Sequence, residues 1–387
     1  MSELTEARWS ETKSALLEGL KGNKRSVMDV TLENTKKYIA ETASSGATSA
    51  GNVATLNRVI LPVIRRVMPT VIANELVGVQ PMTGPVGQIH TLRVRYAEAS
   101  SGTTTTVAGE EALSPFKIAE AYSGDNSTTK AASVAALEGS GGKKLSIQIL
   151  KQTVEAKSRK LSARWTFEAA QDAQAQQGID IEAEIMAALA QEITAEIDQE
   201  ILGSLSSLAG TAAFAYDQSA VSGTATFVGD EHAALAVLIN RAANLIAQRT
   251  RRGAGNYAVV SPTALTVLQS ATTSAFARTT EGSFEAPTNS KLVGTLNSSM
   301  KVYVNTYASS DDVLVGYKGS SESDAPAFYC PYIPLMSSGV VLDPSTFEPT
   351  ISFLTRYGYV ELSNTASSLG NAADYLSKVS VSNLSFS

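Results

Sequence analysis

Apolar residues return at every fourth position of the stretch IDIEAEIMAALAQEITAEIDQEILG, which predicts one long amphipathic helix over residues 179–203. Glu182 and Glu184 lie in its first turn, where the positive end of a helix dipole favours negative charge, and Gly203 is typical of a helix C-terminus. The aliphatic stripe consists of Ile181, Ile185, Leu189, Ile193, Ile197 and Ile201. We expect this helix to form a straight spine of the fold.

Strict alternation of apolar and polar residues predicts two β-strands, over residues 92–96 and 157–167. The apolar positions of the two strands are Leu92, Val94 and Tyr96, then Leu161, Ala163, Trp165 and Phe167. The basic residues of the two stretches include Arg93, Arg95, Arg159, Lys160 and Arg164. We interpret the strands as the two legs of one hairpin.

The sequence between these strands contains SSGTTTTVAGEEAL and GDNSTTKAASVAALEGSGGKK, which hold few apolar side chains. Fixing the backbone costs about 1–2 kcal/mol per residue, and such a tract cannot recover that cost by burying its own side chains. We therefore expect residues 92–167 to form an extended loop that lies along another copy of the chain.

The front of the chain, residues 1–76, is predicted to be an arm. Short amphipathic patterns predict helices over residues 4–20 and 27–41, neither long enough to be stable alone. The composition of TASSGATSAGN, residues 42–52, is typical of a linker, and prolines interrupt the apolar pattern that follows it.

Prolines and glycines crowd into the stretch VGVQPMTGPVGQIH, residues 77–90. A phosphate-binding loop would need a following helix and a Lys-Ser or Lys-Thr pair, whereas a strand follows here. We expect a hinge over residues 77–91 that leads into the extended loop, with Pro81, Gly84, Pro85 and Gly87 making the turns.

Helices and strands alternate from residue 230 onward, which predicts a mixed α/β domain over residues 230–342. It would begin with a helix over residues 230–251 and continue with the strands NYAVVS, MKVYVN and DVLVGYKG, with a helix opened by Pro262 after the first of them. Residues 343–387 contain TFEPTISFLTRYGYVELS, whose strands we expect to return to the domain of the long helix, residues 168–229.

The composition excludes some functions. A net charge of −6 and a pI near 5.2 disfavour broad contact with nucleic-acid phosphates. A single cysteine cannot form an internal disulfide, and neither a leader pattern nor an apolar run of about 18 residues is present. These features predict assembly in a reducing cytoplasm.

Candidate catalytic residues are few. His90, His232 and Cys330 lie in no catalytic motif, and we expect a surface, capping or core role for each. Glu192, Glu196 and Glu200 follow one another at helical spacing but lack the histidine partners of a carboxylate metal site. We therefore predict no catalytic residues, no metal and no cofactor, with the three glutamates on a solvated face or facing cations of a neighbouring subunit.

Several segments, taken in order, resemble one known family. They are IRRVMPTVIANELVGVQPMTGPVGQ, VEAKSRKLSARWTFEAAQD, RRGAGNYAVVSP, VYVNTYA, VGYKGSSESDAPAFYCPYIPL and FLTRYG. The series is similar to the signature segments of the major capsid protein of T-even-like contractile-tailed bacteriophages, or myoviruses, and spans residues 57–358.

The resemblance implies an α+β class with the Hong Kong 97 phage-type capsid fold. Residues 1–76 would be the N-terminal arm, 92–167 the extended loop, 168–229 the peripheral domain with its spine helix, and 230–342 the axial domain. Family members commonly carry an inserted domain in the extended loop, and the tract here is too short for one. Accessory proteins or the arm would then supply the bridging contacts of that insertion.

The resemblance also implies a maturation protease that cuts after an apolar residue, any residue and Glu. This pattern fits Glu18 and Glu41, so residues 1–41 would be a cleavable prepeptide. Further implied partners are other copies of the chain in hexamers and pentamers, vertex or portal proteins, a scaffold, decoration proteins, and enclosed DNA bound without sequence specificity.

We therefore predict a self-assembling shell subunit of the virion, with no membrane association. Arg93, Arg95, Arg159, Lys160 and Arg164 would face acidic surfaces of an adjacent subunit, such as Glu192, Glu196 and Glu200 of its spine helix. The alternatives are a cellular nanocompartment shell of the same fold and a small-molecule hydrolase that uses His232 or Cys330.

Overall fold

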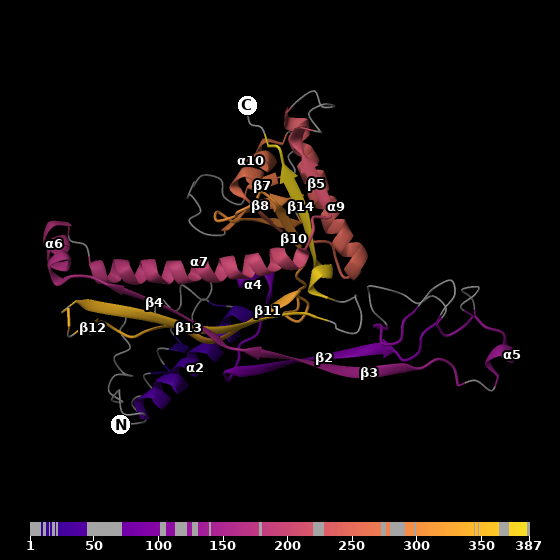
Figure 1. The fold of residues 1–387 in the computed structure, drawn as a ribbon, viewed down its shortest axis with the longest axis horizontal. Coiled ribbons are helices and arrows are strands. Elements are labelled where there is room, and N and C mark those ends of the chain that lie inside the picture. Colours follow the sequence, from indigo (N-terminus) through magenta and orange to yellow (C-terminus); the bar gives the residue numbers. More distant parts are fainter. Residues whose placement is uncertain are drawn as a thin grey trace. The chain divides into compact units, whose positions relative to one another are not determined.

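The computed structural model describes residues 9–10, 13–14, 16–17, 20, 22–44, 72–100, 106–112, 122–125, 131–138, 141–177, 180–219, 228–271, 276–278, 291–297, 299–343, 345–346, 348–363 and 371–384. The chain divides into two compact units, each built from three separate stretches (Figure 1). Unit 1 comprises Met1–Gly87, Val154–Leu202 and Phe328–Val360, and unit 2 comprises Gln88–Thr153, Gly203–Ala327 and Glu361–Ser387.

Unit 1 is built on a five-stranded sheet in the order β1-β11-β13-β12, with β4 also paired to β13. β4 runs antiparallel to β13 over eight residue pairs, from Arg164 opposite Thr350 to Lys157 opposite Tyr357. β1 extends the opposite edge in parallel with β11. The strands are β1 (Gly78–Val79), β4 (Lys157–Arg164), β11 (Ala327–Ser337), β12 (Val341–Leu342) and β13 (Pro349–Glu361).

The long helix α7 (Ile181–Ala209) confirms the helix expected from the aliphatic stripe. The buried part of the stripe within unit 1 is Leu189, Ile193, Ile197 and Ile201. The predicted end at Gly203 is wrong, because the helix continues to Ala209 and ends where Gly210 adopts a positive φ of 65°. Gly203 is an exposed residue inside the helix.

Three other helices belong to unit 1: α2 (Asn23–Ser44), α4 (Ala73–Leu76) and α6 (Phe167–Gln177). α2 begins after Gly22, whose φ of 62° turns the chain, and it buries Val27, Met28, Thr31 and Leu32. This spacing places the buried residues on one side of the helix. The sequence prediction of an arm is therefore too simple for residues 23–34, because they pack into the core of unit 1.

The hairpin predicted from the sequence exists, with one leg misassigned. β2 (Val86–Tyr96) pairs with β3 (Leu145–Glu155) in a two-stranded sheet, whereas β4 pairs with β13. The stretch LSIQILKQTVE of β3 alternates as regularly as β4 does, but it lies at the end of the polar tract. Alternation along the chain could not by itself choose between two strands of equal periodicity.

Unit 2 contains a seven-stranded mixed sheet in the order β5-β14-β10-β6-β9-β8-β7. Strands β6 and β9 run parallel, as do β5 and β14, and the other neighbours are antiparallel. The strands are β5 (Phe214–Asp217), β6 (Tyr257–Val260), β7 (Phe276–Arg278), β8 (Lys291–Leu296), β9 (Met300–Val304), β10 (Val313–Gly316) and β14 (Leu376–Ser382).

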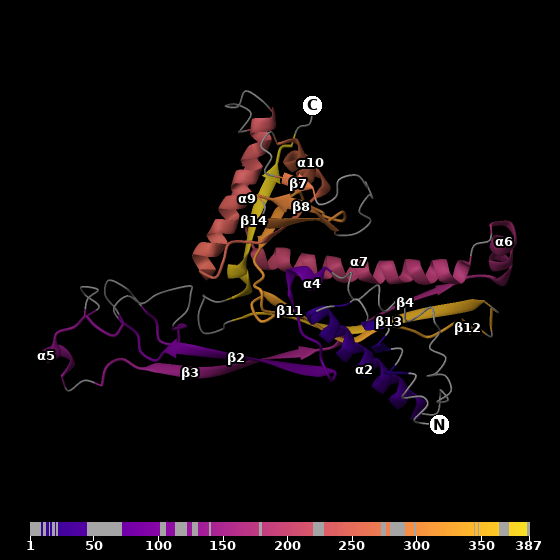
Figure 2. The same ribbon diagram turned by 180° about the vertical axis from the view of Figure 1, so that it is seen from behind.

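Helices α9 (Val228–Thr250) and α10 (Pro262–Ser270) pack on this sheet and close its core (Figure 2). α9 contributes Leu235, Ile239 and Ile246 to the core, each fully buried. Ser261 caps α10 by accepting a hydrogen bond from Ala264 N at 3.1 Å. The three strands and the proline-opened helix expected after residue 250 are confirmed as β6, β9, β10 and α10.

The late strands divide between the units. β13 lies in the sheet of unit 1, as expected. β14 instead lies between β5 and β10 in unit 2, because its residues Leu376 and Val379 complete the core there. The predicted α+β class is confirmed, and the chain holds the long helix, the extended hairpin and the separate α/β unit expected of the Hong Kong 97 phage-type fold. Within the described residues, no helix has both the length and the apolarity to cross a bilayer.

Candidate functional site

The register of the hairpin places apolar side chains opposite one another. Ala97 N donates a hydrogen bond to Lys144 O at 3.1 Å, and counting back along the two antiparallel strands places Leu92 opposite Ile149. Alternate residues of each strand share a face of a sheet. One face of the hairpin therefore carries the even-numbered residues of β2 and the odd-numbered residues of β3.

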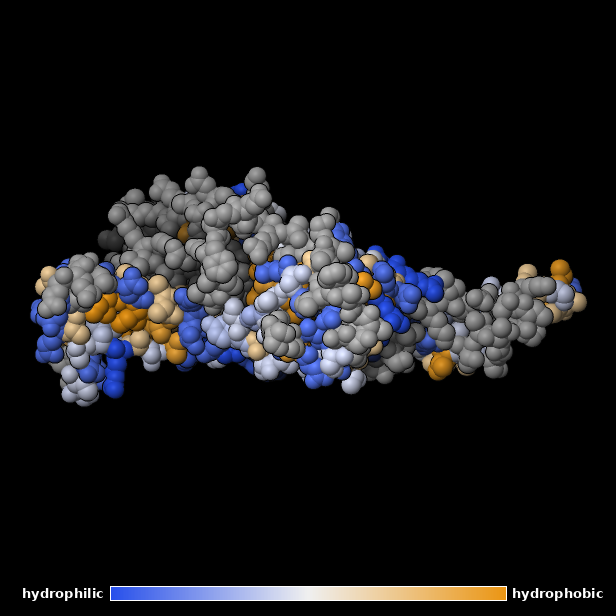
Figure 3. All heavy atoms as spheres, turned by 90° about the horizontal axis from the view of Figure 1, so that it is seen from above, coloured by the Kyte–Doolittle hydropathy of each residue, from blue (hydrophilic) through white to orange (hydrophobic). Residues whose placement is uncertain are grey.

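This face is apolar and exposed. Four large hydrophobic residues are exposed on it, Leu92, Leu145, Ile147 and Ile149, with exposed fractions of 67%, 49%, 72% and 67%. We call these four residues the apolar hairpin face. Small hydrophobic areas are visible toward the hairpin end of the molecule in the space-filling view (Figure 3). Exposed apolar side chains gathered on one face are typical of a surface that contacts another molecule.

The strand end nearest the loop tip is covered by the chain itself. Tyr96 is 7% exposed, and its ring centroid lies 4.5 Å from that of Tyr122. Main-chain bonds attach a returning segment to β2: Tyr96 N donates to Glu110 O at 2.9 Å and Ala112 N to Val94 O at 2.7 Å. The polar tract therefore has local structure near residues 106–112. Leu145, opposite Tyr96, borders this covered end and is the least exposed of the four residues of the apolar hairpin face.

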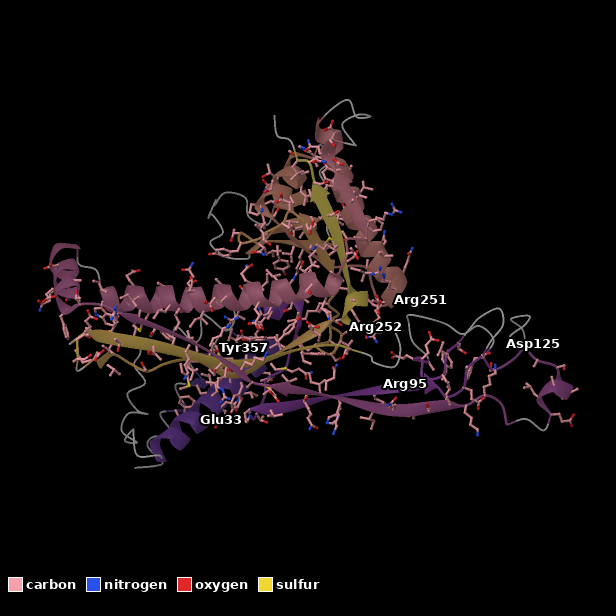
Figure 4. The ribbon with its side chains drawn as sticks, viewed as in Figure 1. Glu33, Arg95, Asp125, Arg251, Arg252 and Tyr357 are labelled. Atoms are coloured by element: carbon pink, nitrogen blue, oxygen red, sulfur yellow. The ribbon has the colours of Figure 1, made fainter. Side chains whose placement is uncertain are left out.

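The same returning segment buries Arg95, which is 5% exposed and whose main chain forms an isolated antiparallel β-bridge with Glu111 (Figure 4). The sequence predicted Arg95 as a contact to an adjacent subunit, on the strand face opposite that of Leu92, whereas the structure buries Arg95 and exposes Leu92. The reason is that residues 106–112 cover the strand end, which single-strand alternation cannot indicate. Arg95 is thus not a surface residue of the isolated chain.

The proline- and glycine-rich stretch includes β1 and runs into the start of β2. Met82 N donates to Pro331 O at 3.0 Å, so this stretch continues the pairing of β1 with β11. Pro85 O accepts a hydrogen bond from Ala156 N at 2.9 Å, which closes the base of the hairpin. The boundary between the units falls after Gly87. Pro81, Gly84, Pro85 and Gly87 thus lie at the entrance to the hairpin, and a hinge there remains a prediction.

Arg159 joins β4 to α7 and β13 inside unit 1. Its guanidinium lies 2.7 Å from Glu196 Oε2 and 2.6 Å from Glu200 Oε2, and its Nε donates to Tyr357 Oη at 2.6 Å. Tyr357 also hydrogen-bonds Glu200. Burial raises the pKa of Glu200, but the hydrogen bonds from Arg159 and Tyr357 outweigh it and hold that pKa below its usual range.

We expect Arg159→Ala to lower the free energy of unfolding of unit 1 by about 1–2 kcal/mol, because the two carboxylates and the tyrosine hydroxyl lose a shared donor at a partly exposed site. Arg159→Lys should not restore the loss, since an ammonium cannot reproduce the planar fork. Urea unfolding measures the change. The exposed neighbour Lys160 supplies the control, and equal losses in Lys160→Ala and Arg159→Ala would contradict the assignment.

The structure does not bring the predicted intersubunit residues together as one cluster. Arg159, Glu196 and Glu200 pair within one chain, and Arg164 lies 3.6 Å from Glu348 of the same chain. Lys160 and Glu192 are exposed. The side chain of Arg93 and residue Glu18 lie outside the described part of the chain, and Glu41 lies in α2 with only its backbone described.

Neither histidine nor the cysteine shows a catalytic arrangement. His90 is exposed on β2, whereas His232 is buried and its Nδ1 hydrogen-bonds Ser270 Oγ. Burial raises the pKa of Cys330 to about 11, which keeps the thiol protonated and unreactive. No group of three or more acidic, histidine or cysteine side chains in the described ranges is placed to hold a metal ion.

Sequence reasoning missed one buried carboxylate, Asp198 of α7. It is fully buried, and its Oδ1 accepts a hydrogen bond from Ile72 N at 2.9 Å, the N-cap residue of α4. The buried face of α7 is wider than the stripe of every fourth residue and includes Thr194 beside Ile193 and Asp198 beside Ile197. The available signal was a second stripe of residues beside the first, Met186, Ala190, Thr194, Asp198 and Leu202, in which Asp198 is the one charged residue.

A long hairpin with an exposed apolar face is typical of a structural protein that assembles through its surfaces. The sequence profile of the family described as "Major capsid protein Gp23" matches residues 53–381. The chain belongs to this family of phage major capsid proteins, and it is a structural subunit of a virion head shell.

Individual relatives agree. The major capsid protein of Vibrio phage KVP40 is 30% identical over 427 residues, which cover 87% of this chain and 82% of that protein. The major capsid protein of Enterobacteria phage T4 is 29% identical over 415 residues, covering 83% and 78%. Among solved structures, a chain from Mycobacterium phage Bobi aligns with a TM-score of 0.48 at 13% identity, covering 81% of this chain and 90% of that chain.

Proposed function

We propose that this chain assembles into hexameric capsomers that build an icosahedral or prolate head shell around double-stranded phage DNA, and that the apolar hairpin face packs on a neighbouring copy. The exposure of Leu92, Leu145, Ile147 and Ile149 carries the proposal. Burying one such side chain stabilises an interface by about 2 kcal/mol. Repetition around a ring and across a shell multiplies this modest contact.

The domain roles follow the same proposal. The extended loop, predicted over residues 92–167, would consist of β2, β3 and the residues between them, because β4 belongs to the sheet of unit 1. The axial domain, predicted over residues 230–342, would end at Ala327, because β11 and β12 also belong to the sheet of unit 1. Arg93, Lys160, Arg164 and Glu192 remain candidates for contacts between copies. The acidic net charge suits a container, because a strongly basic lining would hold the packaged DNA in place.

Further partners belong to the proposal as well. Portal or vertex proteins, a scaffold and decoration proteins would act during and after assembly, with a maturation protease cutting after Glu18 and Glu41. Glu41 lies near the C-terminal end of α2, so a cut there requires the last turns of this helix to open.

The double substitution Ile147→Asp and Ile149→Asp is expected to abolish shell formation and leave a folded, soluble subunit. Both residues are exposed, so their replacement costs the isolated chain little, whereas two carboxylates cannot be buried in an apolar contact without a large penalty. Electron microscopy and sedimentation of the expressed chain measure shells, and thermal unfolding measures the fold.

The matched control is Gln148→Asp. Gln148 is also exposed on β3, but alternation places it on the opposite face of the hairpin. This variant should form shells. Shells at normal yield from the double variant would show that the apolar hairpin face is not an assembly contact.

A further inference from the structure

Met82 is held at its main chain by two different elements of unit 1. Its N–H donates to Pro331 O of β11 at 3.0 Å, and its carbonyl accepts a hydrogen bond from Asn34 Nδ2 of α2 at 2.6 Å. The same Nδ2 lies 2.9 Å from Tyr332 O. Asn34 is 5% exposed, so loss of its amide while α2 stays docked would leave both carbonyls without this donor in a buried place.

The side chain of Met82 is packed at the base of the hairpin. A Cβ added to Gly87 of β2 would lie 3.1 Å from Met82 Sδ, and one added to Gly358 of β13 would lie 3.4 Å from Met82 Cε. A Cβ at Gly358 would also overlap Val154 Cγ1 of β3. Met82 therefore fills the space left by two glycines where the hairpin strands meet β13.

α2 is docked firmly enough to hold Asn34 in place. Val27, Met28 and Leu32 are each no more than 3% exposed, and Lys24 Nζ lies 3.1 Å from Glu75 Oε1. Burial of these three apolar side chains contributes much of the free energy that holds α2 against the rest of unit 1. The turn at Met82 is thus fixed from one side by β11 and from the other by α2.

We propose that α2 restrains the base of the hairpin through Asn34 and Met82, and that release of α2 loosens the turn from which the hairpin projects. α2 then acts as an internal brake on reorientation of the hairpin in the shell. The moment of release rests on the proposed cut after Glu41, whereas the restraint itself does not depend on that cut.

The test measures amide hydrogen exchange in the full-length chain, comparing wild type with Asn34→Leu. The substitution removes the donor but keeps a branched side chain with the same number of heavy atoms in the buried position. Amide exchange should become about tenfold faster at Met82, Gly87 and Ala156. The reason is that losing one buried hydrogen bond makes local opening of this region about tenfold more frequent. Amides in the middle of α2 should keep their protection.

Two further variants test whether α2 restrains the hairpin base. Arg25→Ala, at an exposed position on α2, should leave exchange at the hairpin base unchanged. Leu32→Asp should release α2 and quicken exchange at the same three amides at least as much as Asn34→Leu. Unchanged exchange there after α2 has lost its protection would overturn the restraint. Failure of a protease to cut after Glu41 would refute only the proposed timing.

Discussion

Gly316→Ala is expected to lower the free energy of unfolding of unit 2 by about 3 kcal/mol, because the added methyl group would overlap a buried ring. Gly316 of β10 lies directly opposite Tyr257 of β6, and a Cβ built on Gly316 falls on the Tyr257 ring. Tyr257 is 2% exposed, so its ring cannot move aside without shifting the core.

Gly203→Ala is the matched control, in the same unit and with the same added methyl group. Gly203 lies within α7, and nothing lies within 4 Å of an added Cβ. This substitution should stabilise the chain by about 0.5–1 kcal/mol, since alanine loses less conformational freedom in a helix than glycine does. Guanidinium unfolding of both variants measures the contrast, and equal stability of Gly316→Ala and wild type would refute the close packing at Tyr257.

The pairing of Gly316 with Tyr257 illustrates what the sequence could and could not predict. Both strands were predicted from their apolar runs, because period and composition are local properties. Their register was not, because it depends on which residues meet across a sheet. The same limit explains the misassigned hairpin leg: β3 and β4 alternate alike, and only the tertiary partner of each strand distinguishes them.

The candidate site was predicted in part. Residues 92–96 were correctly placed on an extended hairpin, yet the burial of Arg95 beside Tyr96 was not predicted, because a distant segment covers both faces of that strand end. The glutamates of α7 were recognised as a charged row, but the intrachain partner Arg159 could not be chosen over a partner on another copy. A charge pattern indicates the sign of the charge that a partner residue carries, but not whether that residue lies on the same chain or on another copy.

The N-terminal segment combines two properties that the sequence alone presented as alternatives. Its composition is that of an arm, and the family profile begins only at residue 53. Its helix α2 nevertheless supplies buried side chains to unit 1 and a donor to Met82. A segment that is both part of a core and a candidate for removal is suited to changing the properties of the subunit once, after assembly.

The stability of unit 1 is expected to fall as the pH rises from about 4 to about 7, because of Asp198. Burial raises the pKa of Asp198 to about 7, and the hydrogen bond from Ile72 N opposes this shift only in part. In the unfolded chain the carboxyl titrates near its ordinary value of about 3.9. Between these two values the folded state holds a proton that the unfolded state has lost, so the stabilisation is complete below about pH 4 and is lost by about pH 7.

The change in the free energy of unfolding is at most about 4 kcal/mol, because the pKa of Asp198 in the folded chain lies about three pH units above its value in the unfolded chain. The facing titratable group on β11 is Tyr329, whose own pKa is raised by burial and then by Tyr357 and Asp198, so it stays neutral throughout this range. Asp198→Asn should remove the dependence: its stability relative to wild type should rise steadily across this window. Urea unfolding of unit 1 at a series of pH values measures it.

Glu192→Gln on the same helix is the control, because Glu192 is exposed and its neutralisation should give a difference from wild type that is small at every pH. The carboxyl of Asp198 is the only group changed in the test variant, and the amide keeps an oxygen for Ile72 N. If the difference in free energy of unfolding between Asp198→Asn and wild type stayed constant from about pH 4 to about pH 8, Asp198 would be ionised in the folded chain throughout this range. Water entering unit 1 would then solvate the buried charge.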